Sequence, residues 1–263
     1  MSASTPDSRV TLDLAGRRVL VMGASSGVGR AVAELAARAG AKVALAARRR
    51  ARLDEVALAL RGEGCSAEAL VCDVTQEGAC RSAVTQAISS LGGLDALVYA
   101  SGVSPLCLLG AAGQADWRAV LDVNLIGASL VTAAALGALR ESHGRALYVG
   151  SYSERQTLPG IGLYSVSKSA LSALIEAWRM EHPEVDFTKV VLGNTTGTEF
   201  ANAWGQERTL AITNLWVERG LFPAPSMMPL ANAAEAICAV LAVRGHVDEI
   251  GVMPRLRDAQ VET

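Results

Sequence analysis

The sequence predicts an α/β protein built on a doubly wound parallel sheet of about seven strands, with helices on both faces. Three observations predict this class. Short, nearly continuous apolar runs recur along the chain, as expected of strands that are covered on both faces. Longer segments with helical periodicity lie between these runs. A glycine-rich turn joins the first apolar run to the first helical segment.

Strand and helix alternate throughout, and right-handed crossovers between parallel strands make such a sheet Rossmann-like. The predicted strands are Arg18–Met22, Lys42–Ala47, Glu68–Cys72, Ala96–Tyr99, Ala146–Gly150, Lys189–Leu192 and Glu249–Met253. The predicted helices are Val28–Arg38, Ala51–Arg61, Cys80–Ser90, Trp117–Leu139, Leu163–Glu181 and Asn232–Val243.

All 263 residues are expected to form a single domain, because α/β sheets of this length often fold as one unit. Residues 1–11 are predicted to be a flexible tail. Residues 193–229 contain no predicted strand, and a connection this long in a compact domain is usually functional. We therefore expect the 193–229 segment to be a substrate lid. Its large apolar side chains are Phe200, Trp204, Trp216, Phe222, Met227 and Met228.

Charge and cysteine content exclude several classes of protein. The chain has 24 basic and 26 acidic residues, a near balance that predicts neither a nucleic acid nor an anionic membrane as partner. Its five cysteines are odd in number and include no C-x-x-C pair, which predicts reduced thiols and no metal site. The apolar stretch Leu125–Leu139 is shorter than the ~20 residues that span a bilayer. With no signal peptide recognisable at the start, we expect a soluble, cytoplasmic protein.

The glycine-rich turn predicts a dinucleotide site. It reads Gly23-Ala24-Ser25-Ser26-Gly27-Val28-Gly29, and it follows the first strand and opens the first helix. Glycines permit a tight turn and let backbone N–H groups approach a pyrophosphate, while the helix N-terminus adds partial positive charge.

The end of the second strand predicts NADP(H) as the cofactor. A site that prefers NAD places Asp or Glu there for the ribose 2′-OH, whereas this chain has Ala46-Ala47 followed by Arg48-Arg49-Arg50. Guanidinium groups of Arg48 and Arg49 suit a 2′-phosphate. The alternative is a solvated basic helix start, but cations are disfavoured at a helix N-terminus.

A tyrosine and a lysine four residues apart predict acid–base chemistry. In Tyr164-Ser165-Val166-Ser167-Lys168 both lie on one face of a helix. A tyrosine is a poor acid–base catalyst near neutral pH, and a nearby lysine cation is expected to lower its pKa. Ser151, at the end of its strand, is expected to face the same cleft, and Asn124 completes the candidate set.

The order of these motifs resembles the compact, single-domain branch of the short-chain dehydrogenase/reductase family, over about Ala15 to Pro254. The resemblance implies that Tyr164 exchanges a proton with a carbonyl or alcohol oxygen, which Ser151 hydrogen-bonds. It implies that Lys168 lowers the pKa of Tyr164 and binds the nicotinamide ribose. Asn124 would hold a water that connects Lys168 to solvent.

Other cofactor contacts follow from the same resemblance. Asp73 and Val74, after the third strand, match the family position beside the adenine, although Asp73 also suits a helix N-cap. Where the family usually has Asn-Asn-Ala-Gly, this chain has Tyr99-Ala100-Ser101-Gly102, so Ala100 and Gly102 are expected to border the cofactor. Tyr99 is expected in the core or against the adenosine.

After the sixth strand the family commonly has Pro-Gly and then a threonine that contacts the nicotinamide. Here the proline is missing, and either Thr195 or Thr198 is a candidate for that contact.

The predicted function is NADP(H)-dependent interconversion of a carbonyl and a secondary alcohol on a hydrophobic small molecule. The aromatic residues of the 193–229 segment suggest this substrate, although the same residues would also pack the segment onto the body. Helices rich in small residues, Leu125–Leu139 and Ser169–Trp178, suggest a homotetramer or dimer. The alternatives are a regulatory protein that binds NADPH without turnover, and an epimerase or dehydratase on the same scaffold.

Overall fold

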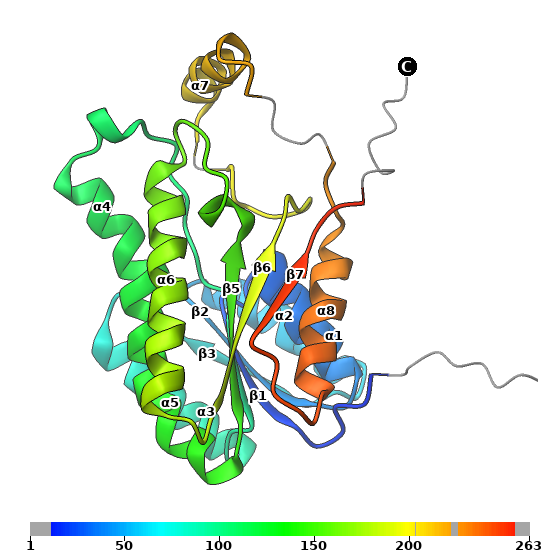
Figure 1. Ribbon diagram of the computed structural model, residues 1–263. Coiled ribbons are helices and arrows are strands. Elements are labelled where there is room, and N and C mark those ends of the chain that lie inside the picture. Colours follow the sequence, from blue (N-terminus) through cyan, green and yellow to red (C-terminus); the bar gives the residue numbers. More distant parts are fainter. Residues whose placement is uncertain (1–11, 203, 222–225, 256–263) are drawn as a thin grey trace, which may run out of the picture.

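Seven parallel strands form one sheet, as predicted, in the order β3-β2-β1-β4-β5-β6-β7. The computed structural model describes residues 12–202, 204–221 and 226–255 (Figure 1). The predicted strands agree with the observed ones to within a few residues. Their observed bounds are β1 Arg18–Met22, β2 Lys42–Ala47, β3 Ala67–Val71, β4 Ala96–Tyr99, β5 Arg145–Ser151, β6 Asp186–Leu192 and β7 Glu249–Val252.

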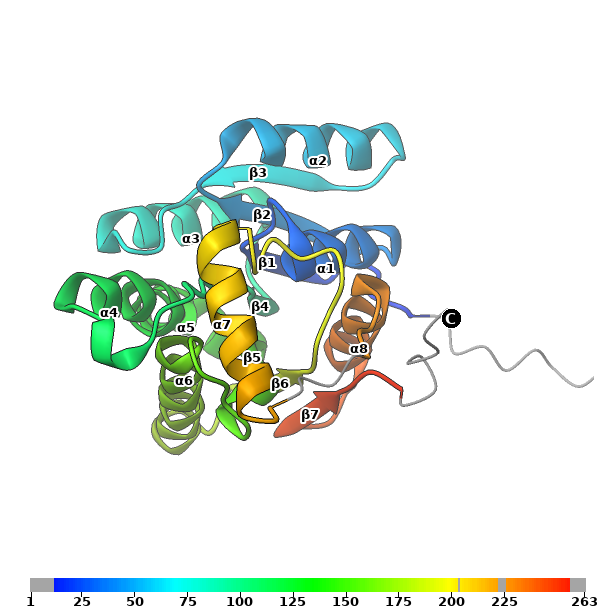
Figure 2. The ribbon, with the colours of Figure 1, turned by 90° about the horizontal axis from the view of Figure 1, so that it is seen from above.

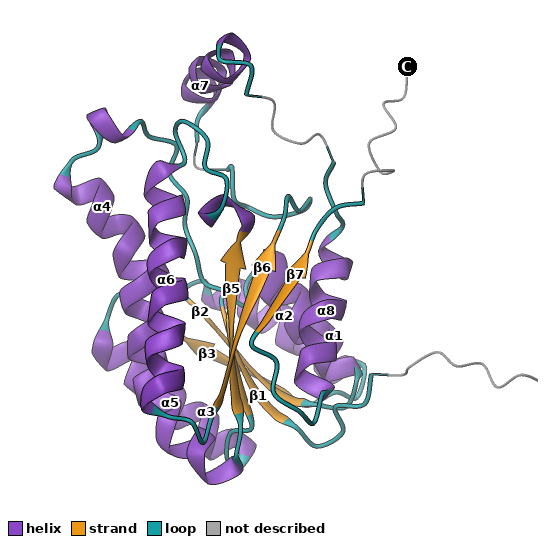
Figure 3. Cartoon of the chain, viewed as in Figure 1, coloured by secondary structure: helices purple, strands orange, loops and turns teal. Residues whose placement is uncertain are grey.

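Helices cover both faces of the sheet (Figure 3). On one face lie α1 Gly27–Arg38, α2 Arg50–Gly62 and α8 Leu230–Ala242, and on the other lie α3 Glu77–Leu91, α5 Gly127–Ser142 and α6 Gly162–Glu181. Side chains alternate along the central strand β1. Val19 and Val21 enter the first apolar layer, whereas Leu20 and Met22 enter the second. Two buried layers therefore hold the sheet between the helices.

Strand order reverses between β1 and β4, because the chain builds β2 and β3 on one side of β1 and all later strands on the other. Ligands of open α/β sheets bind outside the carboxyl ends of the strands at such a switch point. The residues that follow these carboxyl ends include Gly23, Arg48, Asp73, Ala100 and Gly193. The fold thus gathers segments from five strands at one edge.

The predicted helix Trp117–Leu139 is interrupted. It consists of α4 Gln114–Leu121, a one-turn π-helix over Asp122–Ile126, and α5. The whole stretch Gln114–Ser142 is the one helix in the described chain that is long and apolar enough to cross a membrane. In this structure Ala128, Val131 and Leu139 pack into the second apolar layer.

The 193–229 segment holds a helix that the sequence did not predict, α7 Gln206–Glu218. Seen from above, α7 lies across the carboxyl edge of the central strands (Figure 2). The two ends of the segment meet, because Thr195 forms an isolated parallel bridge with Met228. Phe222, expected to be part of this segment's apolar lining, lies outside the described residues.

The glycine-rich turn is fixed by close backbone approaches. Gly23 has φ +85°, and a Cβ there would meet the backbone of Ala100 and Ser101 at 2.8–2.9 Å. A Cβ on Gly29 would lie 2.5 Å from the carbonyl oxygen of Gly23. Helix α1 therefore packs against its own preceding turn at a distance that only glycine allows.

We expect Gly29→Ala to lower the free energy of unfolding by about 1–3 kcal/mol, because the added methyl group overpacks a rigid backbone contact. Urea denaturation measures the change. The matched control is Gly137→Ala on α5, where an added Cβ meets nothing within 4 Å. That control should gain up to about 1 kcal/mol. Equal effects of the two substitutions would contradict the close approach at Gly29.

Candidate active site and cofactor crevice

Strand β5 and helix α6 bring Ser151 and Tyr164 together at the carboxyl edge. Ser151 is the last residue of β5, and Tyr164 lies in the first turn of α6. The phenol is 9% exposed, and burial raises the pKa of Tyr164 to about 12. A hydrogen bond between the side chains of Ser151 and Tyr164 opposes this rise in pKa. The serine hydroxyl thus lies where it and the phenol can both form a hydrogen bond with the same oxygen atom of a bound molecule.

Lys168 lies one helical turn further along α6 and is 3% exposed. Its Nζ donates a hydrogen bond to the carbonyl oxygen of Val149 at 2.6 Å and lies 5.6 Å from the centroid of the Tyr164 ring. Burial lowers the pKa of Lys168 to about 8, and the charge of Glu154 opposes this shift. Desolvation is the largest cause of the shift in the pKa of Tyr164, and the expectation that Lys168 lowers this pKa stays a prediction.

Asn124 is fully buried inside the π-helix turn. Its Oδ1 accepts a hydrogen bond from Val103 N at 2.8 Å, and its Nδ2 donates to Val103 O and to Ser167 Oγ, each at 2.9 Å. The amide thereby joins the loop after β4 to α6. A Cβ on Gly102 would contact Asn124 Oδ1 at 3.5 Å and Lys168 Nζ at 3.7 Å, so Asn124 and Lys168 flank Gly102. One-turn π-helices are frequent at functional sites.

At the other end of the crevice, Arg49 reaches into the glycine-rich turn. Its Nε and Nη2 donate to Ser25 Oγ at 3.1 and 2.9 Å, and Nη2 also donates to Ser26 Oγ at 2.6 Å. Arg48 is exposed and makes no hydrogen bond or ion pair with any described residue. Gly27 begins α1, and Val28 packs partly against the first apolar layer.

The segments after β3 and β4 form the floor of the crevice. Asp73 accepts hydrogen bonds from Thr75 N and Oγ1 at 3.0 and 2.9 Å, whereas the N-cap of α3 is Gln76. The alternative that Asp73 caps this helix is therefore wrong. Val74 is buried beside it. Tyr99 is a core residue, because its ring is buried and its hydroxyl donates to Val123 O at 2.6 Å.

The two threonines predicted to contact the nicotinamide, Thr195 and Thr198, differ in how close they lie to the glycine-rich turn. Thr195 Oγ1 donates to Gly193 O at 2.9 Å and is committed to its own turn. The Cα of Thr198 lies 3.9 Å from the place of a Cβ on Gly27, directly beside the glycine-rich turn. Of the two, Thr198 is the better placed to contact a dinucleotide.

The donors along this crevice could hold the parts of a nicotinamide dinucleotide. The glycine turn and the N-terminus of α1 suit the pyrophosphate, and Arg48, Arg49, Ser25 and Ser26 suit a phosphate on the ribose. Lys168 and Thr198 suit the ribose and carboxamide of the nicotinamide half. In the described ranges, no group of three or more His, Cys, Asp or Glu residues could hold a metal ion. All five cysteines are free thiols.

Sequence reasoning missed Glu154, which follows Ser151 by three residues. Its side chain is only 7% exposed. Its carboxylate accepts from Ser172 Oγ at 2.6 Å and pairs with Lys189 Nζ at 3.0 Å. Ser172 belongs to α6, so Glu154 ties the turn after β5 to the helix that carries Tyr164 and Lys168. A carboxylate next to a strand-end serine was a visible signal, but its buried partners lie 18 and 35 residues away.

Two of the three aromatic residues that the structure describes in the 193–229 segment pack it onto the body. The indole nitrogens of Trp204 and Trp216 donate to Ser104 O and Pro159 O at 2.7 and 2.8 Å. Phe200 is the exception, because its ring meets that of Tyr164 edge-on with centroids 5.0 Å apart. The packing alternative therefore holds for the two tryptophans, and Phe200 is the aromatic residue that faces the candidate acid.

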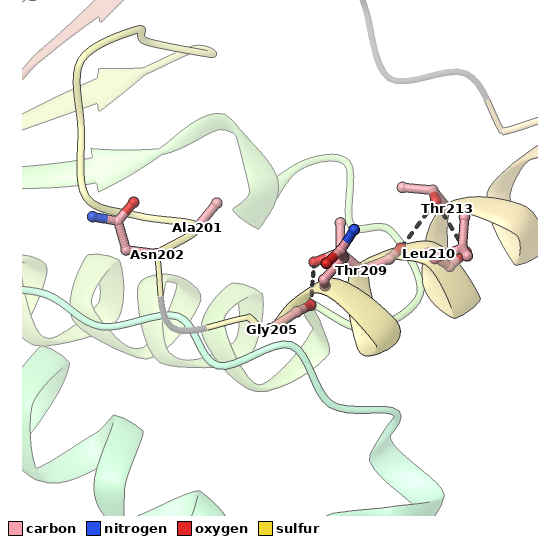
Figure 4. Close-up of a pocket in the computed structure, with 7 residues that line it drawn as sticks. Ala201, Asn202, Gly205, Thr209, Leu210 and Thr213 are labelled. Carbon is pink, nitrogen blue, oxygen red and sulfur yellow. Dashed lines mark hydrogen bonds between the residues drawn. The ribbon is translucent and has the colours of Figure 1, made fainter.

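A shallow hollow lies beside the first two turns of α7 and the residues that precede this helix, Ala201 and Asn202 (Figure 4). The hydroxyls of Thr209 and Thr213 face it but are bonded to carbonyls of Gly205 and Thr209 in the preceding turn. With its polar groups paired locally and no acid–base pair among its lining residues, it lacks the chemistry of the crevice.

A family model for short chain dehydrogenase matches residues 17–209, most of the chain. The chain belongs to the short-chain dehydrogenase/reductase family. The match spans the glycine-rich turn, Asn124, Ser151, Tyr164, Lys168 and the start of α7.

Similar proteins include several short-chain dehydrogenases. The 11-beta-hydroxysteroid dehydrogenase A of Sesamum indicum is 35% identical over 184 residues, which are 69% of this chain and 53% of that protein. The chain thus spans about half the length of this relative. The human dehydrogenase/reductase SDR family member 2, mitochondrial, is 32% identical over 69% of this chain and 70% of its own.

Solved structures share the fold. An alcohol dehydrogenase from Thermococcus sibiricus, complexed with 5-hydroxy-NADP, superimposes with a TM-score of 0.79 at 24% identity, over 90% of this chain and 95% of its own. A dehydrogenase/reductase from Sinorhizobium meliloti gives the same TM-score at 26% identity, over 92% and 96%.

We expect Lys168→Met to raise the free energy of unfolding at pH 7 by about 1–3 kcal/mol, because a buried cation is removed. The folded pKa of Lys168, about 8, lies below its usual 10.5. The cost of burying the charge is therefore fully present below pH 8 and disappears as the pH rises toward 10.5. The advantage of the variant over wild type should shrink across that interval.

Urea denaturation at pH 7, 8 and 9.5 provides the measurement. Lys42→Met serves as the control, because Lys42 is exposed at the start of β2. A Lys168→Met protein that is less stable than wild type by the same amount at every pH would contradict the assigned burial cost.

Proposed function

We propose that this protein is an NADP(H)-dependent oxidoreductase that interconverts a carbonyl and a secondary alcohol. One observation carries the proposal. The hydroxyl of Ser151 lies near enough to the Tyr164 phenol at the carboxyl edge of the sheet to lower the pKa of the phenol, and Lys168 lies one helical turn behind it, with its Nζ 5.6 Å from the centroid of the ring. Membership of the short-chain dehydrogenase/reductase family supports this reading of the three residues.

When bound, NADPH would supply the hydride that reduces the carbonyl carbon. Tyr164 gives its phenolic proton to the carbonyl oxygen, and Ser151 donates a hydrogen bond that orients this oxygen and stabilises its developing charge. Lys168 would hold the nicotinamide ribose and, as a cation, would stabilise the phenolate that remains. In alcohol oxidation Tyr164 takes up the proton. Asn124 holds the loop after β4 against α6 and orders the water that returns protons to Lys168.

The basic residues after β2 support NADP(H) over NAD(H). No carboxylate ends this strand, and Arg48 and Arg49 follow it directly. Arg49 already binds the hydroxyls of Ser25 and Ser26, which lie between Gly23 and Gly27 in the glycine-rich turn. A phosphate on the adenosine ribose would complete this arrangement with bidentate, charge-assisted hydrogen bonds.

A hydrophobic substrate is supported by Phe200, whose ring covers Tyr164. Several relatives are named as hydroxysteroid dehydrogenases, which supports a bulky apolar ketone or alcohol as the substrate of this chain. Exposed apolar side chains on the α4–α6 face, such as Ile126, Val166 and Met180, support a homodimer or homotetramer. Cytoplasmic localisation is part of the same proposal and follows from the reduced thiols.

We expect Tyr164→Phe to lower kcat for ketone reduction by about 100- to 10,000-fold, because the proton donor is lost. NADPH consumption against a panel of hydrophobic ketones and aldehydes gives the rate, and NADPH affinity should change little. Tyr152→Phe is the control, since Tyr152 is 41% exposed and lies next to Ser151 in sequence. Wild-type binding of NADPH without turnover on the whole panel would favour the regulatory alternative.

We expect Arg48→Ala to weaken NADPH binding about 10- to 100-fold and to leave NADH binding nearly unchanged, because only NADPH carries the 2′-phosphate. Isothermal titration calorimetry measures both affinities. The neighbouring Arg50→Ala is the control, since Arg50 bonds Asp54 on its own helix at 2.7 Å. Equal losses for the two cofactors would refute the contact of Arg48 with the 2′-phosphate.

A further inference from the structure

Glu199, at the start of the 193–229 segment, is bound by two arginines of the cofactor crevice. Its Oε2 accepts from Arg49 Nη1 at 2.7 Å, and its Oε1 accepts a short hydrogen bond from Arg52 Nη1. Arg49 and Arg52 lie 150 and 147 residues before Glu199 in the sequence. This contact therefore joins the 193–229 segment to the helix that follows β2.

The same carboxylate is surrounded by donors suited to an anion. Arg52, Arg49 and Ser26 all hydrogen-bond to Glu199, and these bonds hold its pKa at about 2 although partial burial raises it. The carboxylate is therefore ionised throughout the ordinary working range of pH. Glu199 lines a hollow together with Ser25, Ser26, Gly27, Arg52 and Gly197.

All three nitrogens of the Arg49 guanidinium already have hydrogen-bond partners, so a second anion cannot bind without displacing one of them. Its Nε and Nη2 bond the hydroxyls of Ser25 and Ser26, and its Nη1 faces Glu199. A phosphate that takes a bidentate position on Arg49 must approach the Nη1 edge, which the carboxylate covers. Two anions on one guanidinium also repel each other.

We propose that Glu199 is a cofactor-specificity residue that competes with the 2′-phosphate of NADP(H) for Arg49 and Arg52. Binding of NADPH then requires release of the carboxylate, whereas NADH leaves it in place. The inference rests on the proposed function, which places the 2′-phosphate beside Arg49, and it adds Arg52 to this site.

Release of Glu199 would also act on the candidate acid. Phe200 follows Glu199 directly, and its ring lies against Tyr164 and against Trp204, with centroids 5.0 and 5.5 Å away. One short stretch of chain thus contacts the arginines at one end of the crevice and the tyrosine at the other. Displacement of Glu199 from Arg49 would therefore bear on the neighbouring contact of Phe200 with Tyr164.

The test is the ratio of NADPH affinity to NADH affinity, measured by isothermal titration calorimetry on the full chain. We expect Glu199→Gln to tighten NADPH binding about 5- to 30-fold, because the competing anion is removed, with little change for NADH. The control Glu218→Gln removes the same charge from the exposed end of α7 and should leave both affinities unchanged. Circular dichroism melting should give similar Tm values for all three proteins.

The outcomes separate the inference from the proposed function. A rise in the NADPH-to-NADH affinity ratio in Glu199→Gln supports the inference, whichever cofactor wild type prefers. An unchanged or lower ratio overturns it, and it would show that the Glu199 contact only docks the 193–229 segment. A wild-type preference for NADH would overturn the assigned cofactor alone. Failure of wild type to bind either cofactor would overturn both.

Discussion

The reversal of strand order between β1 and β4 is the constraint on which the candidate site depends. It leaves a crevice at the carboxyl edge, and the segments that follow β1, β2, β3, β4 and β5 all begin there. The close approach of Gly29 to Gly23 and of Gly23 to Ala100 keeps this edge narrow. Backbone N–H groups and the N-terminus of α1 are thereby aimed into a space that side chains would otherwise fill.

Burial then sets the chemistry of the reacting groups. Desolvation raises the pKa of Tyr164 and lowers that of Lys168. The structure therefore holds a neutral phenol beside an ammonium group that gives up its proton more easily than an exposed lysine. Ser151 opposes the rise in the pKa of Tyr164, and the charge of Glu154 opposes the fall in the pKa of Lys168. Placing both groups out of water costs folding free energy, and this cost is the usual physical signature of a functional pair. The fixed carbonyl of Val149 keeps the lysine oriented behind the tyrosine.

Much of this arrangement could be predicted from the sequence, because it is encoded locally. Strands buried on both faces leave continuous apolar runs, and the glycine turn and the Tyr164–Lys168 spacing are visible within a few residues. Helix α7 and the π-helix turn at Asn124 were missed, since neither has a distinctive local pattern. The pairing of Glu199 with Arg49, and of Glu154 with Lys189, depends on contacts between distant segments. The choice between Thr195 and Thr198 likewise needed the position of the chain relative to Gly27.

The most direct test of the account is a crystal structure of the protein with bound NADP⁺. The account predicts the 2′-phosphate on Arg48 and Arg49, the pyrophosphate over the glycine-rich turn, and the nicotinamide ring beside Tyr164 and Lys168. Glu199 should then be displaced from Arg49. A dinucleotide bound elsewhere, or one whose nicotinamide lies far from Tyr164, would contradict the central claim that this crevice carries the reaction.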